Sequence, residues 1–437
     1  MTHTAYSVLA AALMAFAAAC ERAEQRADAG PLASRACQVA LAPGPERGDL
    51  DRKITELQTR IRNEHRDSRR ALEQLGHHLV ARARLTNDSG DYNLAVSTAE
   101  CLESRYPGEL AALLVRGHAL HQLHRFREAE AMARILVAKR EFVLDYGLLG
   151  DVLMEQGRLA EAADAYQKMI DIKPFYQSYT RAAHIRWLKG DLAGAIDLIR
   201  TAIRAASPRD PESVAWAYTR LATYELQRGG LAPAQEASDS ALAYQTEYAP
   251  ALLTRGRVLL ALGRPSDAVK DLRRAAAANP LPEYQWILAD ALRLMGRESE
   301  AQSVENDLRS RGAVTDPRTL ALFLATRGES AETALALTER ELLQRADIFT
   351  HDARAWALAA AGHIDEAHAT MTRALAENTH DARLFLHAGL IAASAGRPAE
   401  ARTWLAKADE LRSALLPSEI EMLRQHRVGP TRNHTGD

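Results

Sequence analysis

Apolar residues along this chain recur at the period of an α-helix. The stretch 149–174 is the clearest example: Ala162, Tyr166 and Met169 fall on one helical face, with polar residues between them. Gly157 divides this stretch into two segments, and a proline ends it. A glycine at such a junction supplies the left-handed backbone that a short turn often needs. The pattern predicts a pair of antiparallel helices.

This helical pair is repeated along most of the chain. A small residue follows each turn, and successive copies are 33 or 34 residues apart except for one interval of 39. A period near 34 residues is typical of helix–turn–helix repeats, which stack to bury a continuous core that one pair could not form alone. The residues that define the period are Ala95, Ala129, Ala162, Ala195, Ala234, Ala268, Ala301, Ala334, Ala367 and Ala401.

The repeats predict an all-α protein in which about ten copies occupy residues 71–412. The extra residues of the 39-residue interval are expected to form a longer loop at 207–212. Apolar and charged residues alternate through 49–70, which predicts an N-terminal capping helix. We expect a flexible tether over 20–48, and a C-terminal capping helix with a disordered tail over 413–437.

The N-terminus has the pattern of a targeting segment. Residues 5–19 are almost wholly apolar, too few to span a bilayer comfortably but suited to a signal peptide over 1–19. Small residues precede Cys20 and polar ones follow it, which resembles a bacterial lipoprotein signal in which Cys20 is lipidated. Ala17 stands where a bulky aliphatic residue is usual, and residues 1–4 contain no Lys or Arg. Ordinary cleavage to a soluble periplasmic protein, and a cytoplasmic protein with a short buried helix, therefore stay open.

Charge and motifs narrow the classes of function. The chain has 55 Lys and Arg against 57 Asp and Glu, so it offers no basic field for a nucleic acid. It contains no phosphate-binding loop, no Gly-x-Ser-x-Gly and no His-Glu-x-x-His sequence. The repeats use nearly every residue, which leaves no room for a catalytic domain. We therefore predict a protein that is not an enzyme and requires no cofactor. Cys37 and Cys101 could form a disulfide if the compartment is oxidising.

The repeats resemble those of tetratricopeptide-repeat proteins. The third copy carries this likeness best, with Leu149-Gly150 in its first helix, Tyr166 in its second and a closing Pro174. Four further segments resemble bacterial exported multi-repeat proteins of unassigned activity: 190–195, 281–284, 352–357 and 387–392. The resemblance implies a right-handed α-solenoid that serves as a protein-interaction scaffold and grips peptides or helices in its concave groove.

The first helix of each pair would line that groove. Counting back from the repeat alanines selects a mixture of charged, amide and aromatic side chains, and four of the five tryptophans are among them. Aromatic residues and Arg are the usual anchors of an interaction surface, although a single Trp more often fills a helix crossing. The candidates are Arg84, Asn87, His118, His121, Asp151, Glu155, His184, Trp187, Trp216, Arg257, Trp286, Arg293 and Trp356.

A metal site is a weaker hypothesis. His118 and His121 are three residues apart on one helix and could contact the same ion, with Asp151 of the next copy as a third ligand. No fixed metal motif is present, so we expect no metal.

The leading hypothesis is a scaffold or adaptor of the bacterial cell envelope that binds a protein or peptide and is attached to the membrane through Cys20 if lipidated. The alternatives are an envelope protein that binds a small ligand or a transition metal, and a cytoplasmic adaptor that is not exported.

Overall fold

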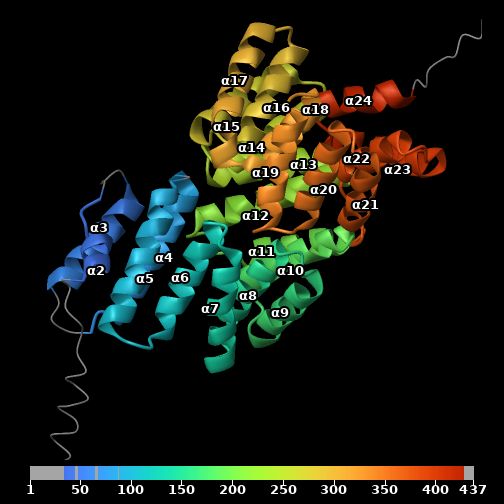
Figure 1. Cartoon of the computed structure of the whole chain (residues 1–437). Coiled ribbons are helices and arrows are strands. Elements are labelled where there is room, and N and C mark those ends of the chain that lie inside the picture. Colours follow the sequence, from blue (N-terminus) through green and yellow to red (C-terminus); the bar gives the residue numbers. More distant parts are fainter. Residues whose placement is uncertain (1–33, 45–47, 64–66, 87, 428–437) are drawn as a thin grey trace, which may run out of the picture. The chain divides into compact units, whose positions relative to one another are not determined.

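The computed structural model describes residues 34–44, 48–63, 67–86 and 88–427, and every regular element in these ranges is a helix. The prediction of an all-α solenoid is confirmed. The described residues form two compact units, one ending at Lys139 and one beginning at Arg140 (Figure 1). The signal segment 1–19, Cys20 and Asn87 lie outside the described residues, as do 428–437 of the expected tail.

Ten helical hairpins follow one another in the described residues. The first unit contains α4 (Arg69–Thr86) with α5 (Ser89–Arg105), and α6 (Leu110–Gln122) with α7 (Phe126–Lys139). The second unit begins with α8 (Val143–Glu155) and α9 (Leu159–Ile172), α10 (Tyr176–Leu188) and α11 (Leu192–Ala205), α12 (Pro211–Gln227) and α13 (Leu231–Tyr244), and α14 (Ala249–Ala261) and α15 (Pro265–Ala278). It continues with α16 (Pro282–Leu294) and α17 (Glu298–Thr315), α18 (Pro317–Arg327) and α19 (Ala331–Leu342), α20 (Ile348–Ala360) and α21 (Ile364–Ala374), and α22 (Ala382–Ser394) and α23 (Pro398–Glu410).

Small residues hold the two helices of each hairpin close together. All ten alanines that define the repeat are buried. At Gly150 in α8, a Cβ atom would lie 2.3 Å from the ring of Tyr166 in α9, so only glycine fits there without a shift of the ring. The turn between α6 and α7, where the sequence lacks its glycine, places His124 at φ 58°. The repeat thus keeps the left-handed turn even without the residue that adopts it most easily.

A disulfide joins two distant segments of the first unit. Helix α2 (Arg35–Ala40) is bonded through Cys37 to Cys101 of α5, and it buries Ala40 and Leu41 in the core of this unit. The expectation of a flexible tether is therefore wrong for residues 35–41, because these apolar side chains have a core to pack against. Helix α3 (Asp49–Asn63) follows and packs on α4.

The 39-residue interval lengthens a helix as well as a loop. Helix α12 has 17 residues where α10 and α14 have 13 each, and it begins at Pro211. Proline is favoured in the first turn of a helix because its missing N–H has no partner there anyway. The expected loop at 207–212 is therefore confined to residues 207–210, where Asp210 caps α12 by accepting a hydrogen bond from the Ser213 amide.

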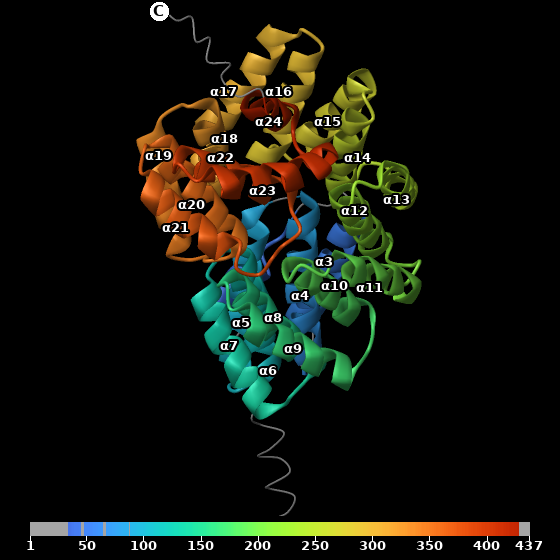
Figure 2. The same cartoon turned by 90° about the vertical axis from the view of Figure 1, so that its right-hand side faces the viewer.

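The second unit closes on itself. Trp187 Nε1 in α10 donates to the carbonyl of His380, 3.1 Å away and 193 residues later, and Thr379 Oγ1 donates to the carbonyl of Leu188. Figure 2 shows the α21–α22 loop reaching down to α10. At the other end, α24 (Pro417–Arg427) packs on α16, where Ser418 donates two hydrogen bonds to Asp290. The later repeats thus cover the inner side of the earlier ones.

Candidate functional site

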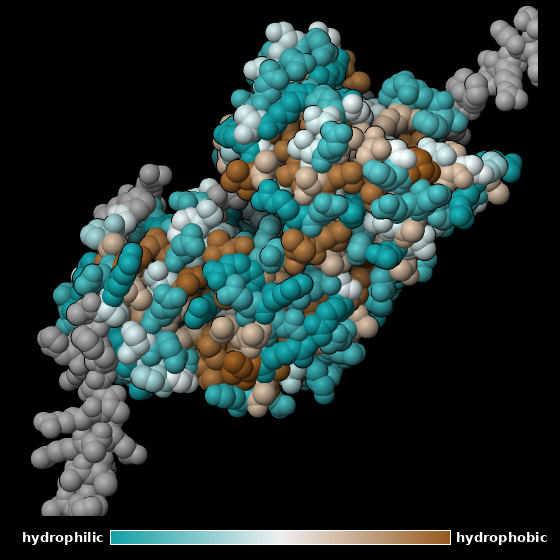
Figure 3. Space-filling view, in the orientation of Figure 1, coloured by the Kyte–Doolittle hydropathy of each residue, from teal (hydrophilic) through white to brown (hydrophobic). Residues whose placement is uncertain are grey.

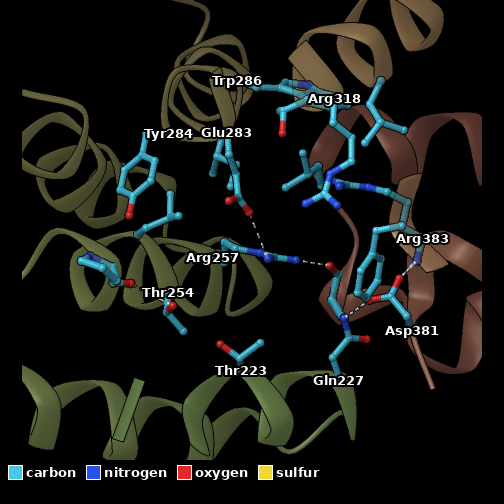
Figure 4. A pocket seen from close by; sticks show the side chains of 18 of the residues that line it. Thr223, Gln227, Thr254, Arg257, Glu283, Tyr284, Trp286, Arg318, Asp381 and Arg383 are labelled. Carbon is cyan, nitrogen blue, oxygen red and sulfur yellow. Dashed lines mark hydrogen bonds and ion pairs between the residues drawn. The ribbon is translucent and has the colours of Figure 1, made fainter. Parts of the chain in front are cut away.

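The closure of the second unit leaves a partly open cavity of about 470 Å³ between its helices. Every first helix of its hairpins, from α8 to α22, contributes side chains to the wall, and α24 and the loops before α20 and α22 complete it. Figure 4 shows Thr223 and Gln227 of α12 and Thr254 and Arg257 of α14 at the cavity, with Asp381 bonded to Gln227. The volume lies within the range of about 300 to 1,000 Å³ that is usual for ligand sites.

Six of the predicted groove residues line this cavity. They come from five different hairpins, as expected for side chains on the inner helices of a solenoid. These six are Glu155, His184, Trp187, Trp216, Arg257 and Trp286.

The three tryptophans of the cavity have different surroundings. Trp187 is buried, stacks on Phe349 and is held by its hydrogen bond to His380. Trp286 is also buried, packs edge-on against Phe323, and its Nε1 has no hydrogen-bond partner among the described residues. Trp216 is only partly buried and forms no ring pair within the described residues. Trp216 is therefore the tryptophan whose face is most available to a ligand.

Most charges around the cavity are paired with one another. Arg345 Nε lies 2.6 Å from Glu155 Oε2, and Arg318 Nη1 lies 2.9 Å from Asp347 Oδ2. Burial alone would raise the pKa of Asp347, but Arg318, Arg345 and the hydrogen bonds from Thr350 hold it below its usual value.

Burial and charge pairing also oppose each other at Glu419, on the C-terminal side of the cavity. Burial opposes ionisation of Glu419, yet its ion pair with Arg383 and its bond from the Leu416 amide keep the pKa of this carboxyl lowered. Arg257 crosses the cavity from α14, with Nη2 2.8 Å from the carbonyl of Ala414 and Nη1 3.9 Å from Glu283 (Figure 4). These pairs hold the side chains of the cavity wall in place. They leave little unpaired charge to attract a ligand.

Arg220 of α12 is placed differently from the other cavity arginines. Its guanidinium lies over the rings of Trp187 and Tyr224, at 5.6 and 5.1 Å from their centroids. Its Nη2 lies 3.3 Å from Nδ1 of His184. Burial, with the nearby charge of Arg220, lowers the pKa of His184 to about 3, so this imidazole is neutral near pH 7.

Three threonines add hydrogen-bond acceptors to the wall. Each hydroxyl donates to the backbone carbonyl four residues earlier. Thr219 donates to Ala215, Thr223 to Thr219 and Thr254 to Pro250. Each hydroxyl hydrogen is thus used within its own helix, which leaves oxygen lone pairs for donors on a ligand. Tryptophan faces, an arginine and hydroxyl acceptors suit a ligand that has apolar, anionic and N–H groups.

Five other predicted groove residues, all among the described residues, do not line the cavity. Counting along the helices selected them, but their tertiary surroundings place them elsewhere. Arg293 pairs with Glu305 and Glu298, outside the cavity. Trp356 donates to Thr326 Oγ1 and stacks on His387 at 4.3 Å, so it fills a helix crossing. In the first unit, Arg84 is exposed while His118 and His121 are partly buried.

Asp151, the last of the predicted groove residues, accepts hydrogen bonds from its own hairpin and from the next one. Both of its carboxylate oxygens accept from Arg181, at 2.8 and 2.6 Å, and one also accepts from the hydroxyl of Tyr166. His121 Nδ1 lies 3.1 Å from Gln122 Nε2. Among the described residues, no group of three or more His, Cys, Asp or Glu side chains is arranged to hold a metal ion.

The sequence missed the residues that reach the cavity from loops and from the C-terminal cap. Asp347, Asp381, Ala414 and Glu419 belong to no inner-helix position of the repeat. Arg220 lies on an inner helix, one turn after Trp216, and the spacing of four residues could have identified it.

Hydrophilic residues cover most of the face seen in Figure 3, with smaller apolar patches between them. In the part of the chain that the structure describes, no helix combines the length and apolar character needed to cross a bilayer.

A chain of stacked helical hairpins is an α-solenoid repeat protein. In its second unit, the first helices of the hairpins converge on one cavity. Three segments, 114–177, 253–309 and 353–414, match the tetratricopeptide repeat family. The chain is a tetratricopeptide-repeat protein, as the sequence predicted. No curated protein sequence matches it.

Several solved structures are similar to parts of this chain. A tetratricopeptide repeat protein from Parabacteroides merdae is 21% identical, with 57% of this chain and 97% of that one covered and a TM-score of 0.32. YrrB, described as a TPR protein with an unusual peptide-binding site, is 13% identical over 39% of this chain and 86% of its own, with a TM-score of 0.30. The human IFIT1 dimer is 12% identical over 86% and 93%, with a TM-score of 0.46.

Proposed function

We propose that this protein is an adaptor of the bacterial cell envelope that binds a peptide segment of a partner protein in the cavity of its second unit. Tetratricopeptide arrays are protein-interaction scaffolds, which supports the general class. The observation that carries the proposal is the convergence of eight inner helices on one cavity with an available Trp216, an arginine and hydroxyl acceptors. Trp and Arg side chains are the usual anchors of interaction surfaces.

The position of this protein in the envelope is supported by two observations. The apolar segment 5–19 has the composition of a signal peptide. The disulfide between Cys37 and Cys101 is of a kind that persists in the periplasm and is rare in the reducing cytoplasm. Labelling of free thiols in whole cells tests this, since export requires Cys37 and Cys101 to resist labelling until a reductant is added.

Replacement of Trp216 by alanine tests binding. We expect Trp216→Ala to reduce recovery of partners from the native envelope by about tenfold or more, the effect of an aromatic anchor worth at least about 1.4 kcal/mol. Trp187 is a poorer probe, because its hydrogen bond to His380 also holds the unit closed. The measurement is affinity purification after chemical cross-linking, with partners quantified by mass spectrometry.

The matched control is Trp404→Ala. Trp404 is a partly buried tryptophan of α23 that stacks on Phe385 and does not line the cavity. Its replacement should leave partner recovery unchanged. Equal recovery with wild type and Trp216→Ala, at equal thermal stability, would remove the cavity as the binding site.

A further inference from the structure

We propose that the second unit opens along a seam, and that a peptide segment enters the cavity sideways through it. The seam lies between the C-terminal ends of α8 and α10 on one side and the loops 343–347 and 375–381 on the other. The proposal rests on the proposed function in taking the cavity as the peptide site. It adds the path by which the site is filled and the contacts that control this path.

Two turn glycines make the closest contacts of the seam. A Cβ atom on Gly157 would lie 2.2 Å from the carbonyl oxygen of Ala346, and one on Gly190 would lie 2.7 Å from that of Asn378. At the six later glycines of positive φ in this unit, a Cβ atom would meet nothing within 4 Å. Among these turn glycines, only the two at the seam are packed against the backbone of a distant loop.

The bonds that hold the seam are mostly polar. The carbonyl of Glu155 accepts from the Ala346 amide at 3.2 Å, and its carboxylate pairs with Arg345. Lys189 Nζ lies 2.7 Å from Glu377 Oε2, and these two side chains are 42% and 34% exposed. An exposed ion pair contributes little to stability, because water solvates both charges well. Parting the loops from the helix ends would largely exchange these bonds for bonds to water.

The apolar contact beside these bonds is loosely packed. Trp187 stacks on Phe349 with 5.6 Å between the ring centroids. A second space of about 40 Å³ lies beside this stack, lined by Leu188 of α10 and by Ile348 at the start of α20. This volume can hold at least one water molecule, and close-packed protein interiors contain few such voids. The seam is therefore packed less tightly than a permanent core.

The closure at the C-terminal end of the unit is built differently. Leu226 of α12 and Val258 of α14 share one hydrophobic core with Leu386 of α22 and with Leu415 and Leu423. Burial of apolar side chains is the main stabilising contribution in folding. We therefore expect this side to stay closed while the hairpins α8–α11 move away from the two loops. The lengthened loop at 207–210, between α11 and α12, joins the part that moves to the part that stays.

Parting the seam would open the cavity from the side. Glu155, Trp187 and Phe349 belong both to the seam and to the cavity wall. An internal segment of a partner protein continues in both directions, so it needs a slot rather than a mouth. The seam supplies such a slot.

Labelling of a cysteine placed in the cavity measures opening without any partner. The reporter is Thr223→Cys in the full chain, with Cys20 replaced by serine and the Cys37–Cys101 disulfide kept oxidised. Thr223 points into the cavity (Figure 4). Iodoacetamide measures access by small molecules, and a polyethylene-glycol maleimide that is larger than the cavity measures opening.

A carbodiimide can lock the seam by joining Lys189 to Glu377. It activates the carboxyl group, the Lys189 amine attacks to form an amide, and the carbodiimide leaves as a urea that carries the displaced oxygen. Mass spectrometry of proteolytic fragments locates the link. We expect the lock to slow maleimide labelling by about tenfold or more, because labelling then requires a larger unfolding, and to leave iodoacetamide labelling unchanged. Lys189→Arg is the control, since arginine keeps the charge but is not acylated under these conditions.

Gly190→Ala should act in the opposite direction. Its methyl group would meet the carbonyl of Asn378, push the loop 375–381 away from α10 and speed maleimide labelling several-fold. Gly263→Ala is the matched control. Its φ of 72° gives alanine a backbone strain similar to that at Gly190, where φ is 83°, but its Cβ would meet nothing within 4 Å.

Equal maleimide rates before and after locking, or equal rates in Gly190→Ala and Gly263→Ala, would overturn the inference. A reporter that the maleimide never reaches in any of these proteins would overturn it too. If the lock slows labelling while Trp216→Ala keeps its partners, the seam stands and the proposed function fails. If Trp216→Ala loses its partners while the lock changes nothing, the proposed function stands and only the seam is removed.

Discussion

His184 shows how the surroundings of one residue set its charge. Its pKa is lowered to about 3 from 6.5, first by burial in the cavity wall and then by the positive charge of Arg220. Between these two values the unfolded chain binds a proton that the folded protein does not. The free energy of unfolding therefore falls as the pH drops below about 6.5, by at most about 1.4 kcal/mol per pH unit from this residue.

Replacing His184 by glutamine should reduce this dependence, because glutamine keeps an acceptor for Arg220 but cannot be protonated. The expected result is a smaller loss of stability between pH 7 and pH 5 for His184→Gln than for the wild type, measured by urea unfolding at each pH. His363→Gln, at an exposed turn before α21, should behave as the wild type. An unchanged pH dependence in His184→Gln would mean that this histidine is not neutral in the folded state.

At the scale of elements, the first unit depends on a covalent link that the second does not have. The bond between Cys37 and Cys101 closes a segment of 64 residues and holds α2 on the core beside α5. A loop of this length loses much of its unfolded-state freedom when it is closed, which stabilises the folded unit by about 4 kcal/mol.

The double replacement Cys37→Ser/Cys101→Ser should therefore lower the free energy of unfolding by about 2–4 kcal/mol, as followed by urea unfolding. Protection of the α2 and α3 amides from hydrogen exchange should fall with it. Adding a reductant to the wild type should give the same loss, and adding it to the double variant should change nothing. A loss confined to helices of the second unit would contradict this assignment.

At the scale of the molecule, closure makes the second unit differ from an open repeat array. In an open array each repeat contacts only its neighbours, and stability is roughly a sum over adjacent pairs. Here Gln227 in α12 donates to Asp381 at 2.7 Å and accepts from the Ala382 amide, across more than 150 residues. Distant repeats of this unit are thereby coupled in stability.

Gln227→Leu should remove both bonds and leave buried Asp381 with fewer donors. We expect a loss of about 2–3 kcal/mol in the free energy of unfolding, together with faster hydrogen exchange in both α10–α12 and α20–α24. Gln167→Leu provides the comparison, since Gln167 bonds to Asp171 on an exposed helix face and should cost little. Faster exchange in α12 alone would show that the closure does not couple the two ends.

The fold was largely predictable because the repeat is local. Ala162, Gly157 and Tyr166 act within one hairpin, and their spacing reports directly on helix crossings and turns. The site was predictable only in part. Glu155, His184 and Trp216 lie on inner helices and were found by counting, whereas Arg293 and Trp356 satisfied the same count but form an ion pair and a helix crossing instead.

The sequence by itself determined what depends on short separations: ten helical pairs, their buried alanines, and the helices that face inward. Only the tertiary structure decided that Cys37 meets Cys101, that Asp381 and Glu419 enter the cavity, and that Arg220 lies over the rings of Trp187 and Tyr224. The reason is physical. A helical period fixes which side of a helix a residue occupies, but the small rotation from one repeat to the next accumulates over the array. That accumulated rotation brings together residues separated by more than 150 positions, and no local pattern records it.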